Sequence, residues 1–229
     1  NLTLSEALAF ALWLHLGTAI AALVYLRREV LSLIREVLTI PRRPSPLLSF
    51  TVLSVLSSGA VGFPLLLAFA NLSTLGGASA MIAIGLLMLP TGWLQLKHPP
   101  KATRARGDLT WADGLLVGIA QGFAVLPGLS RSGLTVAFLL ARRIERREAL
   151  ALSFLIGIPA SLGAAIFASA ETAPGGIPAG ALGAVVAAIV GLLAMRVLLD
   201  IASRIRLGAF VLLTGFAIIA GGIWQFWVA

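Results

Sequence analysis

Long apolar runs, separated by short polar stretches, form the dominant pattern along this chain. A helix needs about 20 mostly apolar residues to cross the hydrocarbon core of a bilayer. Six runs meet this length, and they cover residues 4–26, 47–72, 76–96, 148–170, 178–199 and 208–228. The pattern therefore predicts an all-α integral membrane protein with six transmembrane helices.

Composition supports a membrane protein over a soluble one. Of the 229 residues, 59% are hydrophobic and only 11% are charged, whereas soluble domains are about 25% charged. The mean hydropathy is +1.01. The chain has no cysteine, which excludes disulfides and cysteine-ligated metal sites.

The net charge of +8 comes from basic residues grouped between the apolar runs. Cytoplasmic loops of membrane proteins are rich in Lys and Arg, so we expect these groups to lie in the cytoplasm and not to bind nucleic acid. Four clusters hold 16 of the 17 basic residues: Arg27, Arg28, Arg35, Arg42 and Arg43; Lys97, Lys101, Arg104 and Arg106; Arg142, Arg143, Arg146 and Arg147; and Arg196, Arg204 and Arg206.

The segment between the second and third clusters must then begin and end on the same side of the membrane. It spans residues 112–141 and consists of two apolar arms, 112–126 and 134–141. At 1.5 Å per residue the arms are about 22 Å and 12 Å long, too short to cross roughly 30 Å of hydrocarbon. We therefore expect a re-entrant helical hairpin, its first arm capped by Thr110 and Asp113.

Three spans precede this hairpin and three follow it, which suggests an internal repeat. The chain is then one membrane domain, 1–229, with a first unit at 1–96 and a second at 112–229. An odd number of crossings per unit would invert one relative to the other. The first unit lacks a hairpin and the sequence begins with Asn1, so we expect further residues upstream.

The tip of the hairpin carries the remaining basic residue, Arg131. An arginine at membrane depth costs about 3 kcal/mol or more and is by default a functional candidate. Its planar fork suits a phosphate or a carboxylate, and Gly128 and Gly133 would let the backbone approach such a ligand closely. Ser130 or Ser132 would cap the second arm, whose helix N-terminus also favours an anion.

Other interpretations stay open at this point. Arg131 could simply be satisfied by carbonyl groups of neighbouring helices. Gln121, in the first arm, could line the same cavity or hydrogen-bond to another helix. None of the nine acidic residues lies near the middle of a predicted span, so the sequence offers no obvious general base and no carboxylate metal ligand.

The tip sequence resembles a known family. Residues 126–133, Leu-Pro-Gly-Leu-Ser-Arg-Ser-Gly, with Gln121 before them and Thr135 after them, are similar to a motif of the undecaprenyl-diphosphatases, the bacitracin-resistance phosphatases of prokaryotic membranes. Residues 153–159 with Gly163, and residues 15–18 with Arg27 and Arg28, resemble two further blocks of that family. The resemblance covers essentially the whole chain.

The resemblance implies hydrolysis of undecaprenyl diphosphate to undecaprenyl phosphate, which recycles the lipid carrier of cell-wall and glycan synthesis. It implies a prokaryotic plasma membrane, two re-entrant hairpins, and a divalent cation, Mg²⁺ or Ca²⁺. Carried over by motif, Arg131 would hold the diphosphate. Hydroxyl contacts would come from Ser130, Ser132 and Thr135, and Gln121 would line the pocket together with Gly128 and Gly133.

One departure matters, because the acidic motif that the family carries ahead of the block at His15 is absent. Its place matches the hairpin that the first repeat lacks, so the nucleophile and general base are expected upstream of Asn1. A transporter or flippase for a polyprenyl phosphate, or a non-catalytic lipid-phosphate binder, stays a rival. A homodimer is plausible for a small bundle rich in Gly and Ala.

Overall fold

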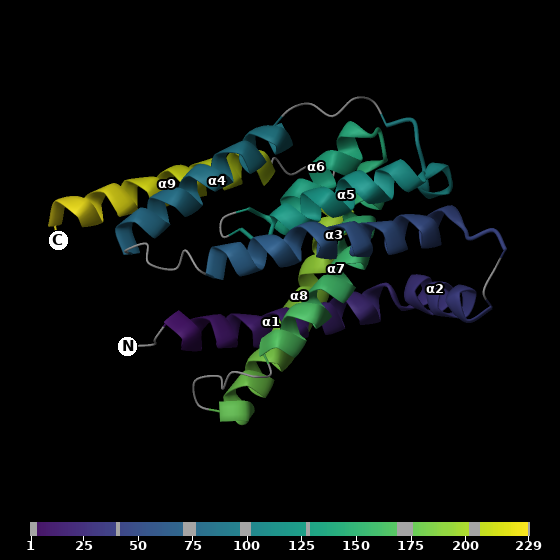
Figure 1. The fold of residues 1–229 in the computed structure, drawn as a ribbon, viewed down its shortest axis with the longest axis horizontal. Coiled ribbons are helices and arrows are strands. Elements are labelled where there is room, and N and C mark those ends of the chain that lie inside the picture. Colours follow the sequence, from purple (N-terminus) through teal and green to yellow (C-terminus); the bar gives the residue numbers. More distant parts are fainter. Residues whose placement is uncertain are drawn as a thin grey trace. The chain divides into compact units, whose positions relative to one another are not determined.

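The computed structural model describes residues 4–39, 42–70, 77–96, 102–126, 129–168, 176–201 and 207–228. Every regular element in these ranges is a helix (Figure 1). The elements are α1 (Leu4–Tyr25), α2 (Arg27–Thr39), α3 (Pro46–Ala70), α4 (Gly77–Leu96), the 3₁₀ turn η1 (Arg106–Asp108), α5 (Trp111–Phe123), α6 (Arg131–Ala141), α7 (Arg146–Ala168), α8 (Gly176–Ile201) and α9 (Leu207–Val228).

The six apolar runs correspond to α1, α3, α4, α7, α8 and α9, so their helical state is confirmed. The two hairpin arms correspond to α5 and α6. Helix α2 was not predicted, because its basic residues place it among the connections. Its apolar side chains recur at helical spacing, with Leu33 buried and Leu31, Ile34 and Leu38 exposed.

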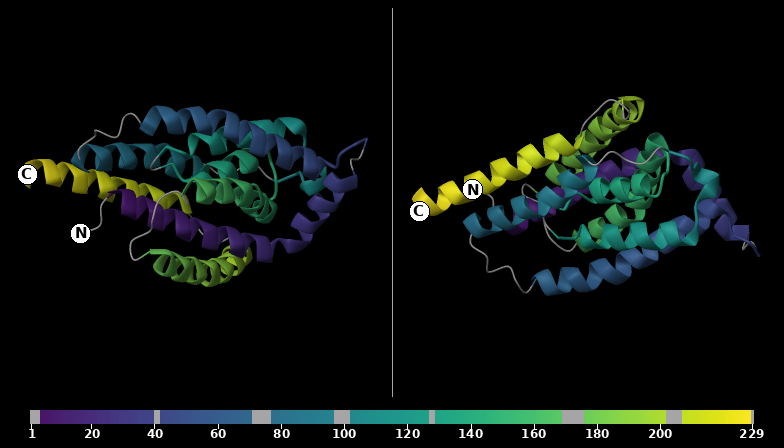
Figure 2. Two further views of the ribbon diagram at one scale, coloured as in Figure 1. Left: turned by 60° about the horizontal axis from the view of Figure 1, so that its bottom comes forward. Right: turned by 90° about the horizontal axis from the view of Figure 1, so that it is seen from above.

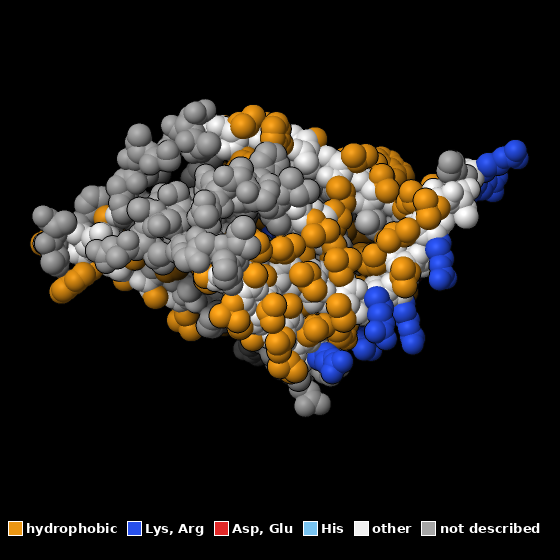
Figure 3. All heavy atoms as spheres, turned by 90° about the horizontal axis from the view of Figure 1, so that it is seen from below, with side chains coloured by type: hydrophobic (Ala, Val, Ile, Leu, Met, Phe, Trp, Pro, Cys, Tyr) orange, Lys and Arg blue, Asp and Glu red, His pale blue; other side chains and the backbone are white. Residues whose placement is uncertain are grey.

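Among the residues that the structure describes, two helices contain windows that are long and apolar enough to cross a membrane. These windows are Pro46–Ala68 in α3 and Ala179–Val197 in α8, and only 17% of each window is buried inside the protein. Shorter apolar stretches occur in α1, α4, α6 and α9. On the face drawn in Figure 3, hydrophobic side chains cover most of the described surface, and Lys and Arg side chains lie toward one edge.

The chain forms two compact units, each built from pieces distant in sequence. The first comprises residues 1–44 and 150–202, in which α1 packs against α8. The two helices approach closely at Gly17, where an added Cβ would lie 2.1 Å from the Ala184 carbonyl oxygen. These units follow contacts in space and do not test the expected division into sequence repeats, which stays a prediction.

The second unit comprises residues 45–149 and 203–229 and contains the hairpin. Helix α9 lies along α4, and α5 lies along α3, as Figures 1 and 2 show. Three glycines one turn apart on α5, Gly114, Gly118 and Gly122, face α3. A Cβ at Gly118 would lie 1.9 Å from Ser57 Oγ, so only glycine permits this approach.

Ion pairs between charged side chains join the two ends of the hairpin. The carboxylate of Asp113, in the first turn of α5, is fully buried. It accepts hydrogen bonds from Arg104 Nη2 and from Arg142 Nε, both at 2.6 Å. Since Arg104 precedes the hairpin and Arg142 follows it, one carboxylate ties both ends of the segment together.

The same carboxylate also caps α5. Asp113 Oδ2 accepts from the backbone N–H and the hydroxyl of Thr110, both at 2.8 Å, which confirms the predicted capping pattern. Burial alone would raise the pKa of Asp113, which lies beside the polar connection and outside the predicted spans. The hydrogen bonds from Arg104, Arg142 and Thr110 outweigh burial and hold this pKa well below its ordinary value of 3.8.

The close approach of α5 to α3 leads to a first prediction. We expect Gly118→Ala to lower the free energy of unfolding by about 1–3 kcal/mol, because the new methyl group collides with Ser57 and the Ser54 carbonyl. Thermal unfolding in detergent measures the effect. Gly59→Ala is the control, since nothing lies within 4 Å of its Cβ and alanine favours the helix. Equal stability of the two variants would contradict the packing argument.

The ion pairs of Asp113 at the base of the hairpin should contribute to stability. We expect Asp113→Asn to destabilise the protein by about 2–3 kcal/mol, somewhat less than for a fully buried pair because both arginines keep partial solvent contact. Glu148→Gln, which breaks the half-exposed pair with Arg106, should cost less than about 1 kcal/mol.

The lowered pKa of Asp113 determines how the difference in stability between the wild type and Asp113→Asn depends on pH. Its contribution to stability is fully present above about pH 4 and is lost as the pH falls further, because the unfolded carboxyl then binds a proton that the folded one resists. Unfolding midpoints of the wild type and Asp113→Asn, measured at several pH values, should converge in acid. A constant gap down to pH 2 would argue against a charged Asp113.

Candidate functional site

The second arm of the hairpin begins with a serine cap. Ser130 has extended backbone geometry, and its Oγ accepts a hydrogen bond from the backbone N–H of Gly133 at 3.2 Å. Its carbonyl accepts the N–H of Leu134 at 2.9 Å. Helix α6 therefore starts at Arg131, three residues before the predicted start of the arm, and Ser130 is the cap in preference to Ser132.

This cap places the motif residues in one helical turn. Ser130 is the N-cap, and Arg131, Ser132 and Gly133 are the first three helical residues. The first N–H groups of a helix point out of its N-terminus and carry a partial positive charge. Arg131 adds a full positive charge to the same turn, so the turn favours an anion.

Thr135 stabilises this turn through its buried hydroxyl group. Its side chain is fully buried, and its hydroxyl donates to the Arg131 carbonyl at 2.9 Å, with the Ser132 carbonyl 3.2 Å away. The hydroxyl proton is thus engaged within the helix. Ser130, in contrast, uses its oxygen as an acceptor, which leaves its own proton for a ligand.

The turn that leads into α6 is only partly described. The N–H of Leu129 donates to the Leu126 carbonyl at 3.2 Å. Pro127 and Gly128 lie outside the described residues, so the predicted role of Gly128 has no structural counterpart here.

Gln121 is buried in α5, and its amide nitrogen donates to Ser58 Oγ of α3 at 3.2 Å. Of its two expected roles, the bond to a neighbouring helix is the one observed. Ser58 belongs to a row of α3 serines that includes Ser54 and Ser57. The Ser54 hydroxyl donates to the Gly114 carbonyl of α5 at 3.1 Å. The Ser57 hydroxyl donates within α3 to the Leu53 carbonyl at 2.6 Å, and its oxygen lies 3.3 Å from the Leu115 carbonyl of α5.

The bond between Ser58 and Gln121 was not predicted from the sequence. The only signal in the sequence was the recurrence of serines at helical spacing on one face of α3.

The residues at the tip do not by themselves fit a divalent cation. Mg²⁺ and Ca²⁺ prefer carboxylate and carbonyl oxygens, whereas this turn offers hydroxyl groups beside the positive charge of Arg131. Within the described parts of the chain, no three His, Cys, Asp or Glu side chains lie together. No catalytic step is therefore assigned to a cation.

Several known proteins are similar in sequence to this chain. The chain is 41% identical over 172 residues to a protein of Methanococcoides burtonii named undecaprenyl-diphosphatase, which covers 72% of this chain and 64% of that relative. A Haloarcula marismortui protein of the same name is 34% identical over 223 residues, covering 93% and 82%. A Moorella thermoacetica one is 31% identical over 217 residues, covering 94% and 81%.

The match to M. burtonii thus spans less than two thirds of that relative's length. A family model described as bacitracin resistance protein BacA matches residues 2–223, which is nearly the whole chain and includes the hairpin. The chain therefore belongs to the family of the bacitracin resistance protein BacA.

Proposed function

We propose that this protein is a membrane phosphatase that hydrolyses undecaprenyl diphosphate to undecaprenyl phosphate and inorganic phosphate. The observation that carries the proposal is the capped first turn of α6, which brings Arg131, the Ser130 hydroxyl and the N-terminus of the helix together. Relatives that share 31–41% of its aligned residues bear the name undecaprenyl-diphosphatase.

The proposed arrangement in the membrane follows from the apolar helices. Helices α1, α3, α4, α7, α8 and α9 cross the bilayer of a prokaryotic plasma membrane, and the basic connections face the cytoplasm. Helices α5 and α6, with 13 and 11 residues, enter and return as a hairpin. The inverted repeat and a homodimer belong to the same proposal.

The proposed net reaction consumes one water: the anhydride P–O bond breaks, undecaprenyl phosphate leaves with the bridging oxygen, the water oxygen ends on the terminal phosphorus as inorganic phosphate, and the protons of the water go to the products or to solvent. Phosphoryl transfer depends mainly on positioning and on stabilising charge that spreads over the phosphate oxygens. Arg131 binds two of these oxygens through its fork, and the α6 amides and Ser130 bind others. Thr135 and Gly133 keep the turn in this shape.

We assign neither a nucleophile nor a general base to the described residues. The divalent cation implied by the resemblance enters only as a counter-charge to the diphosphate, bound with the substrate. In this proposal Gln121, which donates to Ser58, lines the pocket from α5.

The direct test is phosphate release from undecaprenyl diphosphate in detergent by the full-length protein, with and without Mg²⁺ or Ca²⁺. Release without movement of lipid across a vesicle membrane supports the phosphatase. Lipid movement without release would establish the flippase, and binding alone would establish a non-catalytic binder.

Arg131→Lys should lower kcat/KM by roughly 100-fold or more, because a point charge cannot reproduce the bidentate fork. Arg147→Lys makes the same change at an exposed residue and should leave turnover unchanged. Near-normal turnover by Arg131→Lys would remove Arg131 from the proposed site.

Ser130 allows a separation of folding from binding. Ser130→Asp should keep the cap of α6, and hence the unfolding temperature, because aspartate caps as well as serine. Its carboxylate would repel the diphosphate beside Arg131, so KM should rise at least about tenfold. An unchanged KM in this stable variant would show that the anion does not bind at the first turn.

A further inference from the structure

The far end of α6 has an unusual residue in its capping position. The N–H of Arg143 donates to the Leu140 carbonyl at 2.9 Å, and the N–H of Ile144 donates to the Leu139 carbonyl at 3.1 Å. These two bonds define a Schellman motif, in which Arg143 takes the position with left-handed backbone geometry, at φ 65°. Glycine is usual there because a Cβ disfavours this geometry.

The side chain of Arg143 makes no interaction with the described residues that would offset this backbone strain. Its guanidinium is exposed and makes no hydrogen bond or ion pair with any other described residue. Only its backbone is anchored, since its carbonyl accepts the N–H groups of Thr103 and Arg104, both at 3.1 Å. Glycine would be more stable at this position. The presence of arginine therefore indicates that its side chain interacts with a partner outside the described residues.

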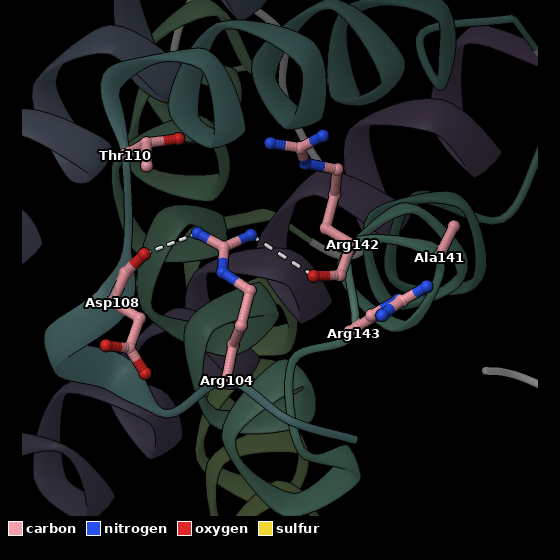
Figure 4. Close-up of a pocket in the computed structure, with 6 residues that line it drawn as sticks. All are labelled: Arg104, Asp108, Thr110, Ala141, Arg142 and Arg143. Atoms are coloured by element: carbon pink, nitrogen blue, oxygen red, sulfur yellow. Dashed lines mark hydrogen bonds between the residues drawn. The ribbon is translucent and has the colours of Figure 1, made fainter. Parts of the chain in front are cut away.

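Arg143 lines a pocket at the base of the hairpin, shown in Figure 4. Its volume is about 430 Å³, and it is lined by Arg104, Asp108, Thr110, Ala141, Arg142 and Arg143. In this view Arg104 bonds to the carbonyls of Asp108 and Arg142, and the guanidinium of Arg142 extends past it toward Thr110. The pocket lies at the opposite end of α6 from Arg131.

Charge decides what such a pocket can hold. Three arginines and one aspartate line it, and the carboxylate of Asp113 is already bound to Arg104 and Arg142. Arg142 uses its Nε for Asp113, so its terminal nitrogens stay available to a ligand. The first turn of α5, at Thr110, adds the positive end of a helix dipole.

We propose that this pocket binds the phosphate group of an anionic lipid headgroup, which Arg142 contacts through its terminal nitrogens and toward which the exposed side chain of Arg143 turns when the lipid binds. The volume exceeds that of a phosphate ion and leaves room for the rest of a headgroup. Basic pockets beside membrane helices on the cytoplasmic side suit such lipids, and the clusters around Arg104 and Arg142 are the ones expected there. Arg143 then stands at the rim to contact the lipid.

The test measures binding, so it is independent of whether the protein hydrolyses a diphosphate. Full-chain protein in neutral detergent is titrated with short-chain phosphatidylglycerol, short-chain phosphatidylcholine or inorganic phosphate, and its thermal unfolding is followed. Only a ligand that binds the folded state raises the unfolding temperature. We expect a rise with phosphatidylglycerol and none with phosphatidylcholine.

Arg143→Gly separates the fold from the site. It removes the strained Cβ, so the unliganded protein should unfold at the same temperature or higher, while its affinity for phosphatidylglycerol falls about tenfold. Arg147→Ala removes one charge from the same cluster outside the pocket and should keep wild-type affinity. A matching Arg143-dependent rise with inorganic phosphate would support the site and identify the phosphate group as what is bound.

Equal losses of affinity in Arg143→Gly and Arg147→Ala would overturn the proposal, because binding would then follow general surface charge. Equal binding of phosphatidylglycerol and phosphatidylcholine would overturn it as well. A clear fall in the unfolding temperature of unliganded Arg143→Gly would show that Arg143 serves the fold.

Discussion

The ion pairs of Asp113 hold together the part of this protein on which the candidate site depends. A helical hairpin of two short arms keeps its shape only if the ends of its backbone are fixed to something rigid. Asp113 does this by joining the residue before the hairpin, Arg104, to the residue after it, Arg142, while capping α5. Its charge is compensated on both sides, which makes its burial tolerable.

The two ends of α6 carry the two positively charged turns. At its start, Ser130 leaves the positive end of the helix open beside Arg131. At its finish, Arg143 occupies a position where glycine would be less strained. An 11-residue helix thus connects two positively charged turns, one at the tip of the hairpin and one at its base.

The helices and the motif turn could be predicted from the sequence, because apolar run length and the Ser-Arg-Ser-Gly order are local properties. The Thr110–Asp113 cap was predictable for the same reason. The role of Arg104 and Arg142 was not, since basic residues in loops are explained equally well by topology. Helix α2 was missed because its charges conceal the helical spacing of its leucines. The bond from Gln121 to Ser58 joins residues 63 positions apart, and only the packing of α5 on α3 brings them together.

The glycines on α5 limit how the hairpin can move. Gly114, Gly118 and Gly122 are spaced by one turn and fit against α3 with no room for a Cβ. A small slide or rotation of α5 would bring side chains into these gaps, so this packing fixes the position of α5 along α3. The first arm of the hairpin therefore behaves as a rigid extension of α3, so a displacement of either helix has to carry the other with it.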